Sequence, residues 1–345
     1  MVMRMGERAE RTDVAIIGAG PVGLFAVFEC GMLGMSAAVF DVLDRPGGQC
    51  AALYPEKPIY DIPGYPEIAA ADLIDRLAEQ AAPFRPRLHL GAAVERLEPC
   101  AGGFRVATRH TAVEAGAVII AAGVGAFGPN RPPLANIEEF EGTSVFYLVT
   151  RREELRGRRV VIAGGGDSAV DWALALAGVA ARIMVVHRRA KFRAAPESAR
   201  RLEALAADGR IELVIPYQLH ALEGAGGHLS AVIAADLDGR TRRLEADVLL
   251  PFFGLSQNLG PIAEWGLALE RNHIAVEPAT AMTQARGIFA IGDIATYPGK
   301  LKLILSGFAE AALAAHAIHP LLHPGAALHF EYSTMKGVPG RSASS

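Results

Sequence analysis

The sequence is poor in cysteine and lacks long apolar runs. Its 345 residues include three cysteines, Cys30, Cys50 and Cys100, and no two of them are spaced as CxxC. Because the cysteines are few and odd in number, we expect no disulfide framework, and the reducing cytoplasm is the favoured location of the protein. No apolar run reaches the ~18 residues of a membrane-spanning helix. Residues 1–11 are charged and carry no apolar h-region, so we expect no secretory signal.

An excess of charge of one sign is also lacking. The chain has 34 Lys and Arg against 37 Asp and Glu, a formal net charge of −3. No polybasic field is present to attract nucleic acid or an anionic membrane, so neither is expected as a partner. The ten histidines show no metal-ligand spacing, and we predict no metal site. At ~100–200 residues per domain, the length predicts two domains.

What the sequence does contain is a dinucleotide-binding pattern, and it occurs twice. In the first copy an apolar strand, residues 13–17, runs into Gly18-Ala-Gly20-Pro21-Val22-Gly23; a helical segment (24–33) and a second strand (37–40) follow and lead to Asp41. The first glycine allows a tight turn, the second lets the backbone approach a pyrophosphate, and the third lets the helix pack on the strand. The acid lies near the ~20-residue spacing of the fingerprint, where it would bind ribose hydroxyls.

The second copy differs where cofactor selectivity is decided. Its strand (159–163) leads into Gly164-Gly-Gly166-Asp167-Ser168-Ala169, followed by a helix (170–176) and a strand (182–186). At the position of the acid stand His187, Arg188 and Arg189. Cations there favour a 2′-phosphate over a bare hydroxyl, so the first copy is predicted to bind FAD and the second NADPH. The alternative is that these three basic residues bind no cofactor and only keep the end of the strand exposed to solvent.

The order of segments predicts an insertion. An apolar strand (118–123) and a turn-rich connector precede the second copy, and a strand (286–293) and an Ala-rich helix (303–318) follow it. The fold class is therefore α/β, with two Rossmann-like three-layer dinucleotide-binding domains and an all-parallel core. The predicted FAD domain comprises residues 1–130 and 256–345, and the predicted NADPH domain, inserted into it, comprises residues 131–255.

These motifs resemble the two-dinucleotide-binding-domain flavoproteins of the thioredoxin reductase type, and among them the thioredoxin-reductase-like ferredoxin–NADP⁺ reductases. The most specific string is Gly47-Gly-Gln-Cys-Ala-Ala-Leu-Tyr-Pro-Glu-Lys57, and Tyr60–Gly64 and Gly292-Asp293 also match. Thioredoxin reductases carry a CxxC in the NADPH domain. Because no cysteine follows Cys100 here, a dithiol relay in that domain is excluded, and electrons must leave the flavin directly.

The resemblance also implies roles for single residues. Tyr54 would stack on the flavin, and a C-terminal tail from a partner subunit would cover it with Tyr332 and bond it through Thr334, which implies a homodimer. The N-terminus of the helix that begins near Lys302 would face the flavin. Core packing is the alternative for Tyr54, and a frayed terminus for Tyr332. The remaining FAD contacts implied are Gly48, Gln49, Val94, Phe127, Gly292 and Asp293.

The sequence thus predicts an FAD-dependent oxidoreductase that transfers electrons between NADPH and ferredoxin or flavodoxin. Hydride would pass to FAD and single electrons would leave it, with no general base on the protein. Three alternatives stay open: an NAD(P)H oxidase or flavin monooxygenase, an enzyme that reduces a separate dithiol protein, and a non-enzymatic FAD/NADP-binding redox sensor. The arginines of residues 151–159, together with Lys300 and Lys302, are candidate docks for an acidic carrier, a solvated face being the alternative.

Overall fold

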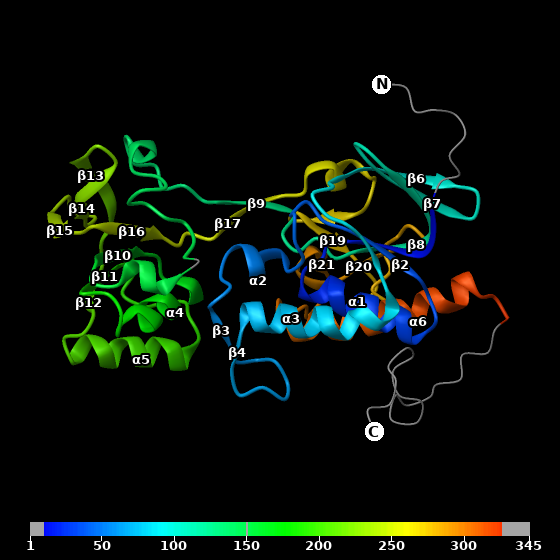
Figure 1. Cartoon of the computed structure of the whole chain (residues 1–345). Helices are drawn as coiled ribbons and strands as arrows, with labels where there is room; N and C mark the ends of the chain where they lie inside the picture. The colour runs from blue at the N-terminus through cyan, green and yellow to red at the C-terminus, as the bar shows by residue number, and fades with distance from the viewer. Residues whose placement is uncertain (1–9, 150, 326–345) are drawn as a thin grey trace. The chain divides into compact units, whose positions relative to one another are not determined.

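The computed structural model describes residues 10–149 and 151–325 (Figure 1). Within these residues the chain forms two compact units. The discontinuous unit comprises residues 10–126 and 257–325, and the inserted unit comprises residues 127–256. The chain passes from one to the other along β9 (Ala126–Pro129) and returns along β17 (Leu255–Asn258), and these two strands pair with each other.

The discontinuous unit is built on a seven-stranded sheet of order β5-β2-β1-β8-β7-β6, in which β20 also pairs with β8. β5, β2, β1, β8 and β20 are parallel, whereas β7 and β6 are antiparallel to their neighbours. The prediction of an all-parallel core is wrong here, because the short turns on either side of β7 have no room for a crossover helix. The strands are β1 (Glu10–Ile17), β2 (Ala37–Phe40), β5 (Arg87–His89), β6 (Val94–Cys100), β7 (Gly103–Thr108), β8 (Ala112–Ile120) and β20 (Ile288–Ala290).

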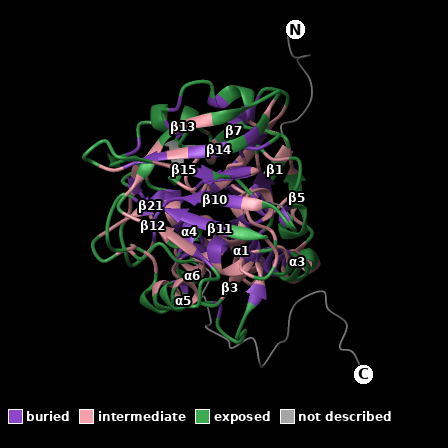
Figure 2. Ribbon diagram, turned by 90° about the vertical axis from the view of Figure 1, so that its left-hand side faces the viewer, coloured by how far each residue is buried: buried purple, intermediate pink, exposed green. Residues whose placement is uncertain are grey.

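Both faces of this sheet are covered. Side chains alternate along β1: Val14 and Ile16 pack in one core with the helices α1 (Pro21–Met32) and α6 (Ile304–Leu322), and Ala15 and Ile17 pack in the core of the opposite face. The helix α3 (Ala70–Ala81) lies along α1 (Figure 1). Burial on both faces explains why residues 14–17 of β1 are all apolar and show no alternation with polar residues. In Figure 2 the central strands of both units are coloured as buried.

Short elements complete the discontinuous unit. Before the insertion, the short elements lie between β2 and β5. After the insertion, they lie on either side of β20 and before α6. They are α2 (Gly48–Ala52), β3 (Pro58–Ile59), β4 (Ile68–Ala69), η1 (Ala82–Phe84), η4 (Gly260–Glu264), β18 (Leu269–Glu270), β19 (His273–Ala275), η5 (Gly292–Ile294) and β21 (Ala295–Thr296).

The inserted unit has a four-stranded parallel sheet of order β12-β11-β10-β16. The helix α4 packs on β10 and β11 and contacts α5, while an antiparallel sheet, β13-β14-β15, shares a core with the other face. Three layers result. Its elements are η2 (Ile137–Glu139), η3 (Arg152–Leu155), β10 (Arg159–Ala163), α4 (Asp167–Leu176), β11 (Arg182–Val186), α5 (Pro196–Ala207), β12 (Glu212–Val214), β13 (Gln218–Ala225), β14 (His228–Ala235), β15 (Thr241–Glu245) and β16 (Val248–Pro251).

The predicted α/β class is confirmed, and several elements have the predicted bounds. The strands expected at residues 37–40 and 182–186 are β2 and β11. The strand and helix expected after the insertion are β20 and α6, and α6 continues four residues beyond the expected end. Among the residues that the structure describes, none of the helices has the length and apolar character needed to cross a membrane.

Candidate functional site

The first glycine-rich loop joins β1 to the N-terminus of α1. Gly18 has φ 116°, and a Cβ built there would lie 2.3 Å from the carbonyl oxygen of Ala121. A Cβ on Gly23 would lie 1.9 Å from the carbonyl oxygen of Gly18. Conformation and close packing therefore both require glycine in this loop, as a tight strand-to-helix turn demands.

Gly20 has a different reason to be glycine. Its backbone is extended, with φ −70° and ψ −177°, a conformation that any residue adopts. The nearest heavy atom to a Cβ at Gly20 would be the Cα of Gly48, 4.0 Å away. Neither conformation nor packing within the protein therefore requires glycine, and its missing side chain leaves open space before α1. The first N–H groups of a helix lack partners within it, so this space suits a phosphate group.

Asp41 is held against this loop by backbone groups. Its Oδ2 accepts a hydrogen bond from the amide of Ala19 at 2.6 Å, and its Oδ1 accepts one from the amide of Leu43 at 2.9 Å. The carboxylate thus ties the end of β2 to the glycine-rich loop, a contact that the residue spacing alone did not predict. A carboxylate has about four acceptor sites, so two bonds leave capacity for ribose hydroxyls.

The segment at α2 lies beside the same loop. The amide of Gly47 donates to the carbonyl of Ala19 at 2.8 Å, which brings Gly48 next to Gly20. A Cβ on Gly123 would lie 3.3 Å from Nε2 of Gln49, so the end of β8 and this amide side chain are neighbours. Gly48 therefore lies at the open N-terminus of α1, and the Gln49 side chain lies beside Gly123, which follows β8.

Tyr54 is half-buried behind α2. The thiol of Cys50 lies 4.0 Å from its hydroxyl, and the ring packs against the core formed by Leu24 and α3. Burial, together with Cys50 and the charge of Asp293, raises the pKa of Tyr54. The phenol is therefore protonated at neutral pH. The ring therefore contributes to core packing. Its stacking on a flavin stays a prediction.

The turn η5 carries Gly292 and Asp293 to the same region. Asp293 influences the pKa of both Cys50 and Tyr54, so its carboxylate lies near them. Gly307, inside α6, allows close approach, because a Cβ there would lie 2.4 Å from Cγ2 of Val22 and 3.3 Å from the Cα of Gly292. The N-terminal turn of α6 consequently packs against η5 and the start of α1.

A buried carboxylate that the sequence motifs did not reveal anchors this turn. Oε2 of Glu310 accepts a hydrogen bond from the amide of Gly292 at 2.7 Å, and its Oε1 accepts one from the hydroxyl of Tyr297 at 2.7 Å. The same oxygen pairs with Lys300, and the two side chains are 3% and 5% exposed. The interpretation of Lys300 as part of a docking surface is therefore wrong, because its ammonium group is buried in an ion pair. A lone acid within the apolar sequence of α6 was the available signal.

The second glycine-rich loop repeats the features of the first. Gly164 has φ 154°, and a Cβ there would lie 2.6 Å from the carbonyl oxygen of Phe252. Gly166 is extended, with φ −98° and ψ −177°, and no heavy atom lies within 4 Å of a Cβ built on it. Asp167 and Ser168, which begin α4, are exposed. The open space before α4 therefore matches the space before α1.

The basic triplet divides into an inner and an outer part. His187 is 7% exposed and its Nε2 lies 3.2 Å from the carbonyl oxygen of Lys191. Burial lowers the pKa of His187; the hydrogen bond to Lys191 opposes this effect, and the nearby arginines add to it. Its ring therefore supports the loop from within, whereas Arg188 and Arg189 are exposed and present the charge.

The structure leaves the predicted FAD contacts of four further residues untested. Val94 begins β6 and is buried. Phe127 lies in β9, of which the backbone is described. Tyr332 and Thr334 fall outside the described residues. Their predicted contacts with FAD stay predictions.

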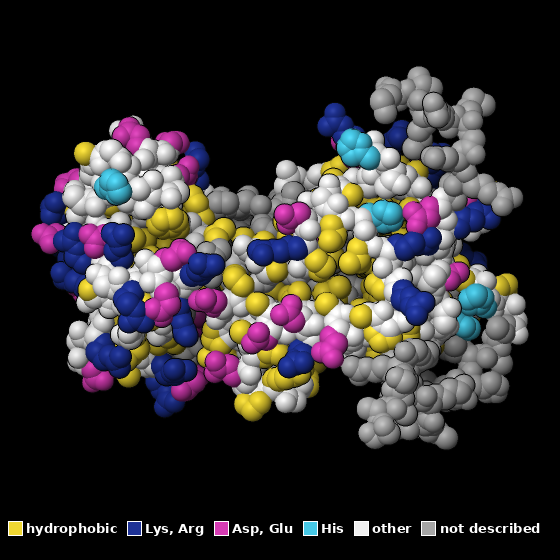
Figure 3. Space-filling model, in the orientation of Figure 1, with side chains coloured by type: hydrophobic (Ala, Val, Ile, Leu, Met, Phe, Trp, Pro, Cys, Tyr) yellow, Lys and Arg dark blue, Asp and Glu magenta, His cyan; other side chains and the backbone are white. Residues whose placement is uncertain are grey.

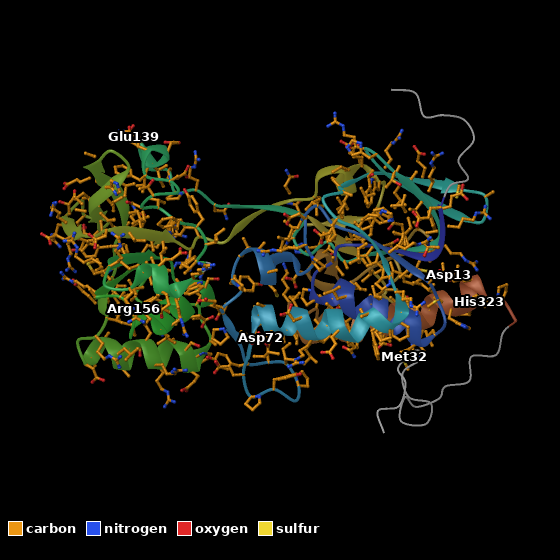
Figure 4. All side chains as sticks on the ribbon, viewed as in Figure 1. Asp13, Met32, Asp72, Glu139, Arg156 and His323 are labelled. Carbon is orange, nitrogen blue, oxygen red and sulfur yellow. The ribbon has the colours of Figure 1, made fainter. Side chains whose placement is uncertain are left out.

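The arginine run before β10 is partly neutralised. Arg156, labelled in Figure 4, pairs with Glu153, and Arg159 pairs with both Asp247 and Glu245. Figure 3 shows Lys and Arg side chains interspersed with acidic ones over the inserted unit. These pairs favour a solvated face over a continuous cationic dock.

Comparisons with known proteins agree with this geometry. Residues 12–317 match the family described as pyridine nucleotide-disulphide oxidoreductase. A protein of Paramagnetospirillum magneticum named ferredoxin–NADP reductase is 64% identical over 95% of this chain and 98% of its own length, and one of Rhodospirillum rubrum with the same name is 65% identical over 96% and 97%.

Solved structures support the fold independently. The crystal structure of T. acidophilum thioredoxin reductase covers 90% of this chain with a TM-score of 0.79 at 23% identity, and 98% of that chain is matched. The predicted resemblance is thereby confirmed in sequence by the relatives and in fold by this structure. The chain belongs to the pyridine nucleotide-disulphide oxidoreductase family.

Proposed function

We propose that this protein is an FAD-dependent enzyme that transfers electrons between NADPH and a ferredoxin or flavodoxin. The observation that carries the proposal is the pair of extended glycines, Gly20 and Gly166, at the N-termini of α1 and α4. Neither is required by the conformation or packing of the protein. Each keeps a helix N-terminus open to a phosphate-bearing ligand. The names of the relatives at 64% and 65% identity support this assignment.

The discontinuous unit supplies the residues that fit FAD. When bound, FAD would supply the redox chemistry, because it exchanges hydride with a nicotinamide and single electrons with a carrier. Asp41 would hold the adenosine ribose while its backbone bonds keep it beside the loop. Asp293 would bind the ribityl chain, from a turn that Glu310 fixes through Gly292. The protonated phenol of Tyr54 would offer the flavin an uncharged ring.

The inserted unit supplies the residues that fit NADPH. Gly166 would admit the pyrophosphate to the N-terminus of α4, where Ser168 offers a hydroxyl donor. Arg188 and Arg189 follow directly after β11 and are exposed. Guanidinium groups bind phosphate through paired N–H donors, so these two side chains would select the 2′-phosphate.

Cysteine chemistry does not fit the transfer of electrons to the acceptor. All three cysteines precede the inserted unit. Cys50, the one nearest the site, is buried, and this burial raises its pKa to about 11. A protonated thiol is neither a nucleophile nor a relay. The acceptor would therefore take electrons from the flavin edge directly, as a one-electron carrier does.

The assembly and location belong to the same proposal. A homodimer in the cytoplasm fits the tail residues Tyr332 and Thr334, which the motif resemblance assigns to the flavin of a partner subunit. It also fits the scarcity of cysteine. Sedimentation of the purified full chain would test the dimer, and the full chain should sediment as a dimer. A chain without residues 326–345 should bind FAD less tightly than the full chain, as a titration with FAD would measure.

The experiment that tests the enzymatic proposal is anaerobic reduction of the yellow protein by either nicotinamide. NADPH should bleach the flavin absorbance quickly and NADH slowly. In the double variant R188A/R189A the preference should fall while the rate with NADH changes little. Bleaching by NADPH followed by equally fast reoxidation in air without a carrier would favour the oxidase alternative, and no bleaching at all would favour a redox sensor.

A further inference from the structure

The loop that carries the arginines is tied to the second glycine-rich loop. We name residues 188–195 the arginine loop. The amide of Arg193 donates to the carbonyl of Gly165 at 2.6 Å, and the amide of Ala195 donates to Oδ1 of Asp167 at 2.8 Å. The His187 ring closes the contact from inside: a Cβ on Gly165 would lie 2.1 Å from its Cε1. Two segments that are separate in sequence are therefore held as one surface.

Further contacts fix the middle of the arginine loop. His187 is bonded through Nε2 to the carbonyl of Lys191, and its ring stacks on Phe192 with the centroids 5.2 Å apart. The loop forms no helix or strand, yet three of its residues, at positions 191, 193 and 195, are bonded to neighbouring structure. Arg188 and Arg189 are exposed side chains on a backbone that is already ordered. Such preorganisation lowers the entropic cost of binding a ligand.

Asp167 lies where the pyrophosphate is expected to bind. It is the first residue of α4, at the helix end where the dipole and free N–H groups attract an anion. A carboxylate there repels the pyrophosphate that Gly166 leaves room for. Ser168 shows that a neutral polar side chain is accommodated one position later. The structure shows one bond that this carboxylate makes, the bond to Ala195 at the end of the arginine loop.

We propose that Asp167 is a positioning residue for cofactor selectivity, which holds the arginine loop in place through Ala195 and at the same time weakens binding of the pyrophosphate. This inference rests on the proposed binding of NADPH to the inserted unit. The two effects act on different parts of the cofactor. The ordered arginines raise the affinity for NADPH and the carboxylate lowers it. NADH lacks the 2′-phosphate, so for NADH only the lowering by the carboxylate applies.

The test is the Michaelis constant for each cofactor in D167A and D167N, measured on the FAD-loaded full chain. In D167A the KM for NADPH should rise roughly tenfold, the order expected when one hydrogen bond to a charged group is lost. The KM for NADH should fall, because the repulsion is gone. In D167N the amide oxygen still accepts the Ala195 N–H and the repulsion is gone, so the KM for NADPH should equal the wild-type value or fall below it.

A matched control separates this role from a general effect of charge. E203A removes one negative charge from the exposed side of α5 in the same unit and should leave the ratio of the two KM values unchanged. Equal changes in both KM values in D167A, or no change, would overturn the inference while leaving the proposed function in place. A wild-type protein without preference for NADPH would instead overturn the proposed function on which the inference depends.

Discussion

Replacing Gly166 by Ser should raise the stability of the protein and lower its affinity for NADP⁺. Gly166 is the N-cap of α4, has an extended backbone, and would have no heavy atom within 4 Å of an added Cβ. Serine is a better N-cap than glycine by a few tenths of a kcal/mol. It also reduces the backbone freedom of the unfolded chain, an effect of ~0.4–1 kcal/mol at compatible positions. The folded state should therefore gain about 0.5–1 kcal/mol.

Binding should move in the opposite direction. The serine hydroxyl would accept hydrogen bonds from the N–H groups at the start of α4, which the cofactor pyrophosphate needs, and its Cβ would occupy the open space. Loss of these contacts should weaken NADP⁺ binding about tenfold or more, equivalent to ~1.4 kcal/mol. Thermal unfolding of the variant should show a midpoint about 1–3 °C higher, and calorimetric titration with NADP⁺ should show the lower affinity.

Two other glycines provide controls. Gly178, just beyond the other end of α4, is also open around a Cβ, so G178S should leave NADP⁺ affinity unchanged. Gly164 has φ 154° and a Cβ there would clash with Phe252, so G164S should lose stability as well as binding. The reasoning would be refuted if G166S bound NADP⁺ as tightly as the wild type, or if it lost as much stability as G164S.

Three further predictions concern stability and cysteine chemistry. K300M should cost about 3–5 kcal/mol, because it leaves the carboxylate of Glu310 buried without its cation; thermal unfolding measures this, and K300M/E310Q should recover part of it. Hydrogen bonds from Arg159 lower the pKa of Asp247, so its stabilising contribution is present above the unfolded carboxyl pKa of about 3.9 and is lost as the pH falls through the lower folded value. D247N should therefore unfold more easily at pH 7 and show a smaller further loss in acid than the wild type, in urea titrations at both pH values. Burial raises the pKa of Cys50 to about 11, so alkylation of this thiol should be slow at pH 7 and C50A should keep its electron-transfer activity; fast alkylation at pH 7 would contradict the assignment.

The two dinucleotide loops could be predicted from the sequence because their requirements are local. Gly18 and Gly164 are predicted by the tight turn that each loop must form. Asp41 is predicted by its spacing in sequence from the first glycine of the loop. The order of strands and helices after the insertion followed from the same local patterns. The antiparallel strands β6 and β7 were missed because an all-parallel rule was extended to a segment whose turns are too short for crossovers.

Other features depend on tertiary contacts that no local pattern reports. Lys300 looks like an exposed cation in the sequence and becomes buried only because α6 brings Glu310 beside it. His187 and Arg188 are adjacent, yet one faces the core and the other faces solvent. The bond from Ala195 to Asp167 joins residues 28 positions apart. The contact between Ala195 and Asp167 forms only when the helix α4 packs on the strand β11.

Electron transfer from NADPH to a one-electron carrier is tested directly by the reduction of cytochrome c, measured on the purified yellow protein with and without added ferredoxin. We expect reduction that depends on ferredoxin and that NADH supports poorly. Rapid reduction of the flavin by NADPH with no gain from ferredoxin or flavodoxin would contradict the proposed function.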